Sequence, residues 1–356
     1  GRPISAEYAR TRMRWEQVAE VLQVKGGSET HPFLSPEDEF ADYEIYGFVF
    51  GAGMDPIPAA PGGYLRTALL RGLQIEGTVG VNPFKLGLQG GSDTHTGVPD
   101  ISEEGFAGRY GNQSGPAGGL VGAPTFPGSN PRGGIGWDSA AQGITGAWST
   151  ANTREALTAA FKRKEVYATS GPRIQLRIFG GFDFDAEDAN ARDIAAVGYS
   201  GGVPMGGDLA QAPNDMPVSL LIHAVKDPMG ANLDRVQVIK GWLDDNGETH
   251  EQVYDVAWAG QRTAVNGKVA AIGSTVDVAR ATYDNTIGGA ELSTVWVDPD
   301  FDSEERAFYY VRVLEIPTPR YSTYDAVAMG LDPAEATGRP VAIQERALSS
   351  PIWYTP

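Results

Sequence analysis

The sequence predicts an α/β fold for its first half and an antiparallel β-sandwich for its second half. In residues 1–175, short apolar strands end in polar loops and alternate with helical segments, which is typical of parallel α/β structure. After residue 176, short alternating strands are separated by turns, and Asn246-Gly247 between two of them is a strong hairpin signal. We therefore expect two domains, 1–175 and 176–356.

Apolar periodicity predicts the elements of the first half. In chain order they are a helix at 5–18, a strand at 18–24, a helix at 63–76, a strand at 84–89 and a helix from 152. The helix at 63–76 is amphipathic, since its leucines fall on one side. Thr153 is placed to cap the last helix, and a basic run at 162–164 complements its C-terminal end.

In the second half, alternation of apolar and polar residues predicts four clear strands. They are expected at 218–225, 236–242, 252–258 and 308–314. Within the first half, residues 97–147 are rich in Gly, Pro and Ser and have no sustained period. Embedded aromatic residues such as Phe106 and Trp137 predict that this long excursion is ordered and packed instead of structureless.

The amino-acid composition excludes several classes of function and of metal ligand. The 356 residues include 46 Gly and 24 Pro, a loop-rich composition, and 41% hydrophobic residues, which are enough for a sizeable core. The net charge of −17 repels phosphate backbones and anionic membranes, so we expect neither nucleic acid nor membrane as a partner. The absence of Cys leaves His, Asp and Glu as metal ligands.

Two nearly identical hexapeptides are the most informative feature of the sequence. Residues 26–31 (GGSETH) and 90–95 (GGSDTH) differ only by Glu for Asp, and each follows an apolar strand. In an extended segment, residues i and i+2 point to the same side. Asp93 and His95 are therefore expected to face one pocket, and so are Glu29 and His31.

Carboxylate and imidazole together suit Zn²⁺, Mn²⁺ or Fe²⁺. We expect Asp93 and His95 to be metal ligands, with Glu29 and His31 as further ligands or as catalytic groups that move a proton. The alternative is that both segments are strand-end turns capped by Ser and acid side chains. The two remaining histidines, His223 and His250, fall in alternating strands and are predicted to be structural.

Longer motifs resemble a known family. VLQVKGGSETHPFLSPEDEFADYE, GSDTHTG and REALTAAFKRKEVYATSGPRI look like the C-terminal portion of an uncharacterised bacterial domain family related to the polymerase and histidinol phosphatase (PHP) superfamily. LDRVQVIKGW, FYYVRVLEIPTPRYSTYDA and SPIWYTP are similar to the distal region of that family. The resemblance covers essentially the whole chain.

The resemblance implies part of a distorted PHP-like (β/α) barrel in residues 1–175, with two or three divalent metals at the strand ends. The terminal D-x-H motif of the superfamily matches Asp93 and His95. Lys25 and Arg173 are expected to bind substrate. The early H-x-H motif of the superfamily has no counterpart here, so we expect further ligands from an N-terminal portion of the protein, as a separate chain or a missing segment.

These observations predict a metal-dependent hydrolase, most simply a phosphoesterase acting on a small phosphomonoester or phosphodiester through metal-activated water. Two alternatives stay open: a non-catalytic protein that binds carbohydrate or a partner, and a metal-dependent hydrolase of sulfate esters or amides. The protein is expected to be soluble and periplasmic or secreted, with cytoplasmic location as the alternative, and to form a homo-oligomer if it assembles.

Overall fold

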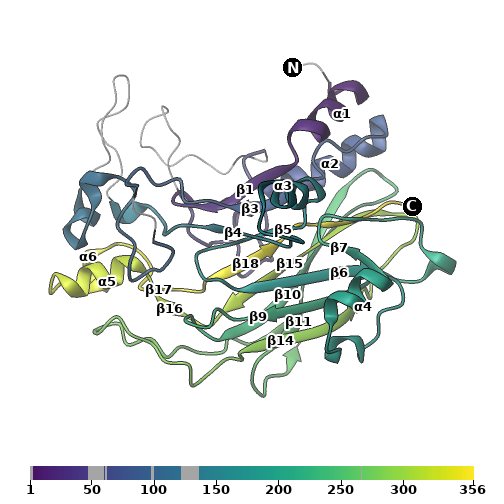
Figure 1. The fold of residues 1–356 in the computed structure, drawn as a ribbon. Coiled ribbons are helices and arrows are strands. Elements are labelled where there is room, and N and C mark those ends of the chain that lie inside the picture. Colours follow the sequence, from purple (N-terminus) through teal and green to yellow (C-terminus); the bar gives the residue numbers. More distant parts are fainter. Residues whose placement is uncertain (1–2, 47–59, 61, 98–99, 122–135, 266) are drawn as a thin grey trace.

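The computed structural model describes residues 3–46, 60, 62–97, 100–121, 136–265 and 267–356 (Figure 1). Strand outweighs helix in this part of the chain, and none of its sheets closes into a barrel. The expected partial (β/α) barrel is therefore wrong. The strands of the first half do not follow one another as parallel neighbours, because two of them join a sheet built mainly from the second half.

The largest sheet has eight strands in the order β11-β10-β15-β18-β5-β4, with β19 paired to β15 and β8 paired to β19. Its strands are β4 (Ile144–Ala147), β5 (Val166–Thr169), β8 (Asp208–Leu209), β10 (Leu233–Leu243), β11 (Thr249–Trp258), β15 (Arg306–Glu315), β18 (Arg346–Ser349) and β19 (Ile352–Tyr354). β5 pairs antiparallel with both β4 and β18. A barrel of parallel strands would need parallel partners at both of these edges.

A four-stranded antiparallel sheet packs against one face of the large sheet. It has the order β14-β9-β6-β7 and contains β6 (Gln175–Gly181), β7 (Gly202–Pro204), β9 (Ser219–Val225) and β14 (Glu291–Val297). Ile178 and Ile222 from this sheet share a fully buried core with Val236, Val311 and Val313 from the large sheet. The alternating strands of the second half thus build antiparallel sheets, as predicted.

The opposite face of the large sheet is covered by a third layer (Figure 1). This layer holds β1 (Val18–Gln23), β2 (Gly26–Gly27), β3 (Gly87–Gly90) and the helix α2 (Leu65–Val79). Leu69 and Leu73 of α2 are fully buried and pack with Ile239 and Phe308 of the large sheet. The leucine face predicted for this helix is confirmed, and it packs on the large sheet in the same layer as β1 and β3.

The remaining elements are short. The helices are α1 (Ala6–Trp15), α3 (Arg154–Arg163), α4 (Ile194–Gly201), α5 (Tyr321–Ala328) and α6 (Pro333–Ala336), and the small strand pairs are β12 (Ala264–Val265) with β13 (Lys268–Val269) and β16 (Thr318–Pro319) with β17 (Ala342–Ile343). The Thr153 side chain accepts from the Ala156 amide, which confirms the predicted cap of α3. No helix in the described segments has both the length and the apolar character needed to cross a bilayer.

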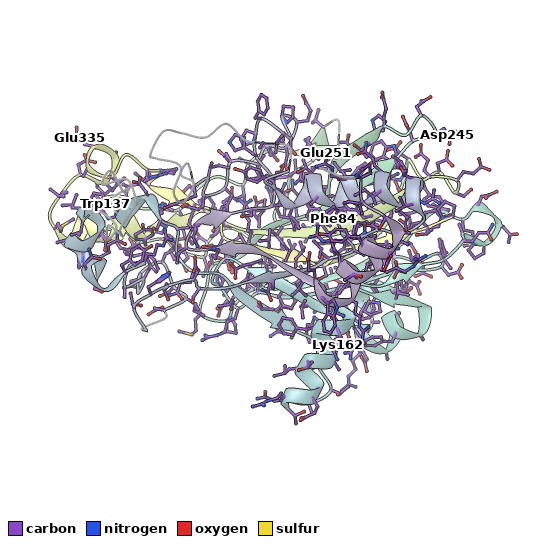
Figure 2. All side chains as sticks on the ribbon, turned by 90° about the horizontal axis from the view of Figure 1, so that it is seen from above. Phe84, Trp137, Lys162, Asp245, Glu251 and Glu335 are labelled. Atoms are coloured by element: carbon purple, nitrogen blue, oxygen red, sulfur yellow. The ribbon has the colours of Figure 1, made fainter. Side chains whose placement is uncertain are left out.

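The described part of the excursion at 97–147 is packed, as predicted. Phe106 and Trp137 are buried against Tyr321 of α5, and the Trp137 indole donates to Asp325 at 3.0 Å. Figure 2 shows Trp137 at the same end of the molecule as Glu335 of α6, far from Asp245 at the tip of the β10–β11 hairpin. Residues 98–99 and 122–135 of the excursion lie outside the described residues.

Candidate functional site

The carboxyl ends of β1 and β3 meet at one edge, because these two strands pair in parallel from Val18–Gly87 to Leu22–Gly90. Beyond the last ladder pair, the Gly91 amide donates to the Leu22 carbonyl at 2.9 Å, and the Val24 amide donates to the Ser92 carbonyl. The segments that follow the two strands therefore run side by side. This arrangement brings Lys25, at the end of the first strand, to Asp93 in the second hexapeptide.

Lys25 and Asp93 form an ion pair at this edge. Asp93 has a left-handed backbone conformation, with φ of 48°, which Asp tolerates better than most residues. Both side chains are about one-third exposed, so a ligand can reach the pair from solvent. Burial and the positive charge of Arg109 lower the pKa of Lys25 from its usual value.

His95 lies next to this pair and is exposed. Its amide donates to the Arg109 carbonyl at 2.8 Å, and its ring lies 5.0 Å from the Tyr110 ring. The Arg109 residue is only 6% exposed; its guanidinium lies over the Tyr110 ring and donates to the Tyr46 hydroxyl at 3.1 Å. We call Lys25, Asp93, His95 and Arg109 the strand-end site.

Arg109 was missed by the sequence reasoning. The signal in the sequence is an Arg-Tyr pair set between two glycines, Gly108 and Gly111, within the excursion at 97–147. Its Nε atom has no hydrogen-bond partner among the described residues, although the atom is buried. A buried guanidinium with an unused donor, beside Lys25, makes this edge favourable for an anion in a chain that is otherwise strongly acidic.

The first hexapeptide takes a different path from the second. Gly26-Gly27 form β2, which folds back antiparallel on β1, and the Ser28 amide then donates to the Val21 carbonyl at 2.8 Å. The chain passes beneath the start of α2, where the Arg66 amide donates to the Glu29 carbonyl. The two acid-Thr-His segments are therefore not equivalent in space, despite their matching sequences.

Glu29 is buried in a cluster of paired charges, which we call the four-charge cluster: Glu29, Asp38, Arg66 and Arg312. Arg66 lies 2.7 Å from both carboxylates, and Arg312 lies 3.1 Å from Glu29 and 2.6 Å from Asp38. The Tyr310 hydroxyl also donates to Glu29 at 2.6 Å. These partners occupy the Glu29 carboxylate, so a ligand or catalytic role for it stays a prediction that the geometry does not favour.

His31 is half-buried beside α2. Its Nδ1 accepts from the Phe33 amide at 3.0 Å, and its ring lies 5.6 Å from the Tyr64 ring. Among the described residues, no group of three metal-binding side chains includes any of the four predicted ligands. The strand-end site thus offers two donors, Asp93 and His95, with the Lys25 ammonium on the carboxylate, and the described residues do not by themselves complete a metal site there.

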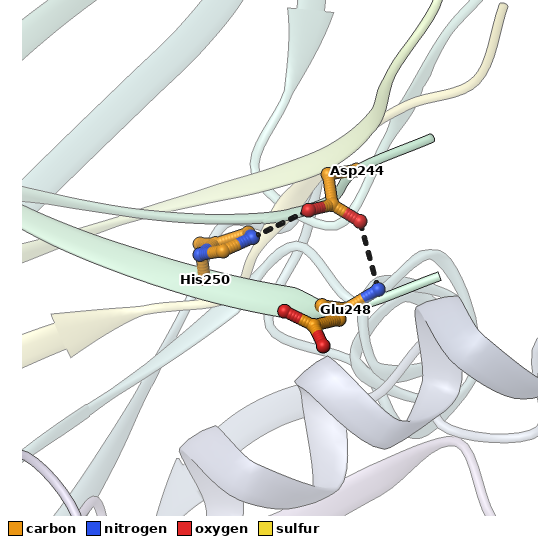
Figure 3. A group of neighbouring side chains, drawn as sticks. All are labelled: Asp244, Glu248 and His250. Carbon is orange, nitrogen blue, oxygen red and sulfur yellow. Dashed lines mark hydrogen bonds and ion pairs between the residues drawn. The ribbon is translucent and has the colours of Figure 1, made fainter. Parts of the chain in front are cut away.

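A group of three such side chains does occur at the β10–β11 hairpin: Asp244, Glu248 and His250 (Figure 3). The Asp244 carboxylate accepts from the amides of Asn246 and Glu248 and from the His250 ring at 2.9 Å. These bonds tie the turn together, as Asp side chains commonly do. The predicted Asn246-Gly247 hairpin is confirmed, and the bonds within the turn account for the Asp244 carboxylate.

Arg173 lies at a cavity of about 230 Å³, where the loop after β5 meets the loop between β9 and β10. Its backbone amide donates to Asp227 at 2.7 Å, while its side chain is exposed. The structure thus brings together Lys25, Asp93 and His95 of the predicted residues. Arg173 lines the separate cavity instead, and Glu29 is held in the four-charge cluster.

The family model described as "Protein of unknown function (DUF3604)" matches residues 1–356. The chain belongs to the DUF3604 family. No curated protein and no solved structure matches it. The expected membership in an uncharacterised domain family is confirmed, whereas the relation to the PHP superfamily stays a prediction; the DUF3604 match spans both the strand-end site and the antiparallel sheets.

Proposed function

We propose that this DUF3604 chain is a hydrolase of small phosphate esters, related to the PHP superfamily and dependent on divalent metal. The observation that carries the proposal is the strand-end site, where parallel β1 and β3 bring Lys25 and Asp93 together beside His95 and Arg109. Two cations at an accessible edge favour an anionic ester. A small substrate suits a chain of net charge −17 better than a polyanion does.

In this proposal Lys25 and Arg109 bind the phosphoryl oxygens and offset the charge that builds up on them during transfer. Asp93 holds the Lys25 ammonium in position. Glu29 takes no part in these steps, because Arg66, Arg312 and Tyr310 already engage its carboxylate.

Asp93 and His95 are also the proposed donors to Zn²⁺, Mn²⁺ or Fe²⁺, with further donors coming from outside the described residues. A bound ion would supply water of lowered pKa and neutralise phosphate charge. Elemental analysis of the purified chain tests this role. Asp93→Ala and His95→Ala are each expected to reduce the metal content, while His250→Ala retains it; equal metal in all three variants would contradict the ligand assignment.

The activity test compares His95→Ala with the matched control His250→Ala. With p-nitrophenyl phosphate and bis-p-nitrophenyl phosphate as substrates and Mn²⁺ or Zn²⁺ added, His95→Ala is expected to lower kcat about 10²-fold or more, because it loses a donor to an ion whose charge stabilisation is worth several kcal/mol. Lys25→Met is expected to raise KM. His250→Ala should leave both constants unchanged, because its ring belongs to the hairpin turn.

The same assay separates the alternatives. Turnover of nitrophenyl sulfate or an anilide, without turnover of either phosphate, would mean that the substrate is a sulfate ester or an amide and not a phosphate ester. No turnover of any of these esters or amides by the wild-type chain with added metal would refute the proposal and favour a binding protein.

A further inference from the structure

A cavity forms a second candidate site, and none of the four strand-end residues lines it. Five acidic residues line the cavity of about 230 Å³: Glu103, Glu104, Asp227, Glu315 and Glu345. Glu315 ends β15, Glu345 immediately precedes β18, and the Glu315 amide donates to the Glu345 carbonyl at 2.9 Å. The pairing of β15 with β18 therefore holds these two acids side by side at the end of the large sheet.

Glu315 is the unusual member of this group. The residue is 1% exposed, and neither of its carboxylate oxygens has a hydrogen bond of good geometry, although the Ala231 backbone lies close to the carboxyl group. Burial and the nearby charges of Glu345 and Asp227 raise its pKa well above the usual range. A buried carboxyl group with both oxygens unused is costly, and such a group is commonly explained by a bound partner.

The other polar groups around the cavity are already committed. Asp227 accepts from the amides of Arg173 and Met229, at 2.7 and 2.9 Å. The Lys226 ammonium, whose charge acts on Glu315, donates to the carbonyls of Asp227 and Gly230. None of these groups neutralises the two free oxygens of Glu315.

Burial and the neighbouring Glu345 raise the pKa of Glu103 well above its usual range. Burial also raises the pKa of Glu345 to about 6. The Tyr43 hydroxyl donates to Glu345 at 3.0 Å, and the Ser170 hydroxyl donates to it as well. The cavity thus presents a carboxyl group whose oxygens have no hydrogen bond of good geometry, Glu315, next to two further acids, Glu103 and Glu345.

We propose that this cavity binds a small organic cation through its ammonium or guanidinium head. Several N–H donors spread over one such head can reach acceptors that are too far apart for a bare ion. Among the described residues, these acids do not supply three ligand atoms within 4.8 Å of one another, which disfavours direct metal coordination. Tyr283 and Tyr324 line the same cavity and offer aromatic rings to the cation or its alkyl chain.

The volume agrees with this class of ligand. A water molecule occupies about 30 Å³ in the liquid, so the cavity holds a molecule of several heavy atoms. Arg173 also lines this cavity, but its side chain is exposed, so its positive charge can stay in solvent and need not repel a bound cation. The inference is independent of phosphoesterase activity, because it uses none of the strand-end residues.

The test is calorimetric titration of the whole chain with agmatine and with putrescine at low salt. Agmatine or putrescine is expected to bind, and Glu315→Gln, which keeps the shape but cannot carry the negative charge that pairs with a bound cation, is expected to weaken binding about tenfold or more. Glu335→Gln is the matched control, since Glu335 is exposed on α6 and outside the cavity lining, and it should bind like the wild type.

Glu345→Gln provides a second variant in case Glu315→Gln fails to fold, and melting temperatures check both. It too should weaken agmatine binding, because it removes the charge that faces Glu315. No binding of either amine by the wild type at millimolar concentration would overturn the proposal. So would unchanged affinity in the folded variants, or Ca²⁺ binding that is tighter than that of both amines and depends on Glu315.

Discussion

Replacing Arg312 with Met is expected to lower the free energy of unfolding by about 3–5 kcal/mol, as measured by urea denaturation. Arg312 is fully buried and pairs with both Glu29 and Asp38. Removing it leaves two carboxylates for one guanidinium, that of Arg66, in a site with almost no solvent. The loss is large because an uncompensated buried charge keeps its full desolvation cost.

The matched control is Arg280→Met. Arg280 also forms an Arg–Asp ion pair, with Asp277 at 2.9 Å, but its side chain is 79% exposed. Removing an exposed pair of this kind costs less than about 1 kcal/mol. Comparable losses in the two variants would contradict the view that the four-charge cluster is a buried structural unit.

Acid should weaken the same cluster. Burial raises the pKa of Asp38 and Glu29, but the charges of Arg312 and Arg66 outweigh it and hold both pKa values below the usual range. Near pH 4 the unfolded carboxyls take up protons while the folded ones do not, so stability falls as the pH drops below about 4. This acid dependence should become shallower in Arg312→Met, in which the two pKa values rise.

Gly26→Ala is expected to destabilise the protein by more than about 3 kcal/mol, with a matching fall in melting temperature. Gly26 has φ of +84°, and a Cβ atom at this position would lie 1.7 Å from the Glu44 carbonyl oxygen. That atom is backbone and cannot swing away. Moving it would also disturb the ion pair of Glu44 with the buried Arg320.

Gly247→Ala separates conformational strain from collision. Gly247, in the β10–β11 hairpin, has φ of +78°, but a Cβ atom there meets nothing within 4 Å. It should therefore cost only about 1 kcal/mol, the price of a left-handed Ala. A loss for Gly26→Ala no larger than this would mean that the turn into β2 can relax around a side chain.

Several local features were predictable because their causes are local. The Thr153 cap of α3, the leucine face of α2 and the Asn246-Gly247 hairpin each depend on residues within a few positions of one another. The parallel contact between β1 and β3 followed from a strand–helix–strand pattern. Lys25, Asp93 and His95 could therefore be placed at one edge before the fold was known.

The barrel prediction failed because strand partners are chosen over long range. β4 and β5 are short and apolar, and nothing near them in sequence shows that the other neighbour of β5 is β18, some 180 residues later. The same holds for the acidic cavity. Glu103, Asp227, Glu315 and Glu345 are scattered along the chain, and only the pairing of β15 with β18 and the surrounding loops bring them together.

The sequence by itself determined the short-range elements, the acidic balance and the strand-end position of the two hexapeptides. Only the tertiary structure decided that the hexapeptides differ. Gly26 turns the chain back into β2, whereas the chain after Gly91 continues along β1. The reason is that a buried carboxylate needs charged partners, and those of Glu29 come from Arg66 and Arg312, 37 and 283 residues away.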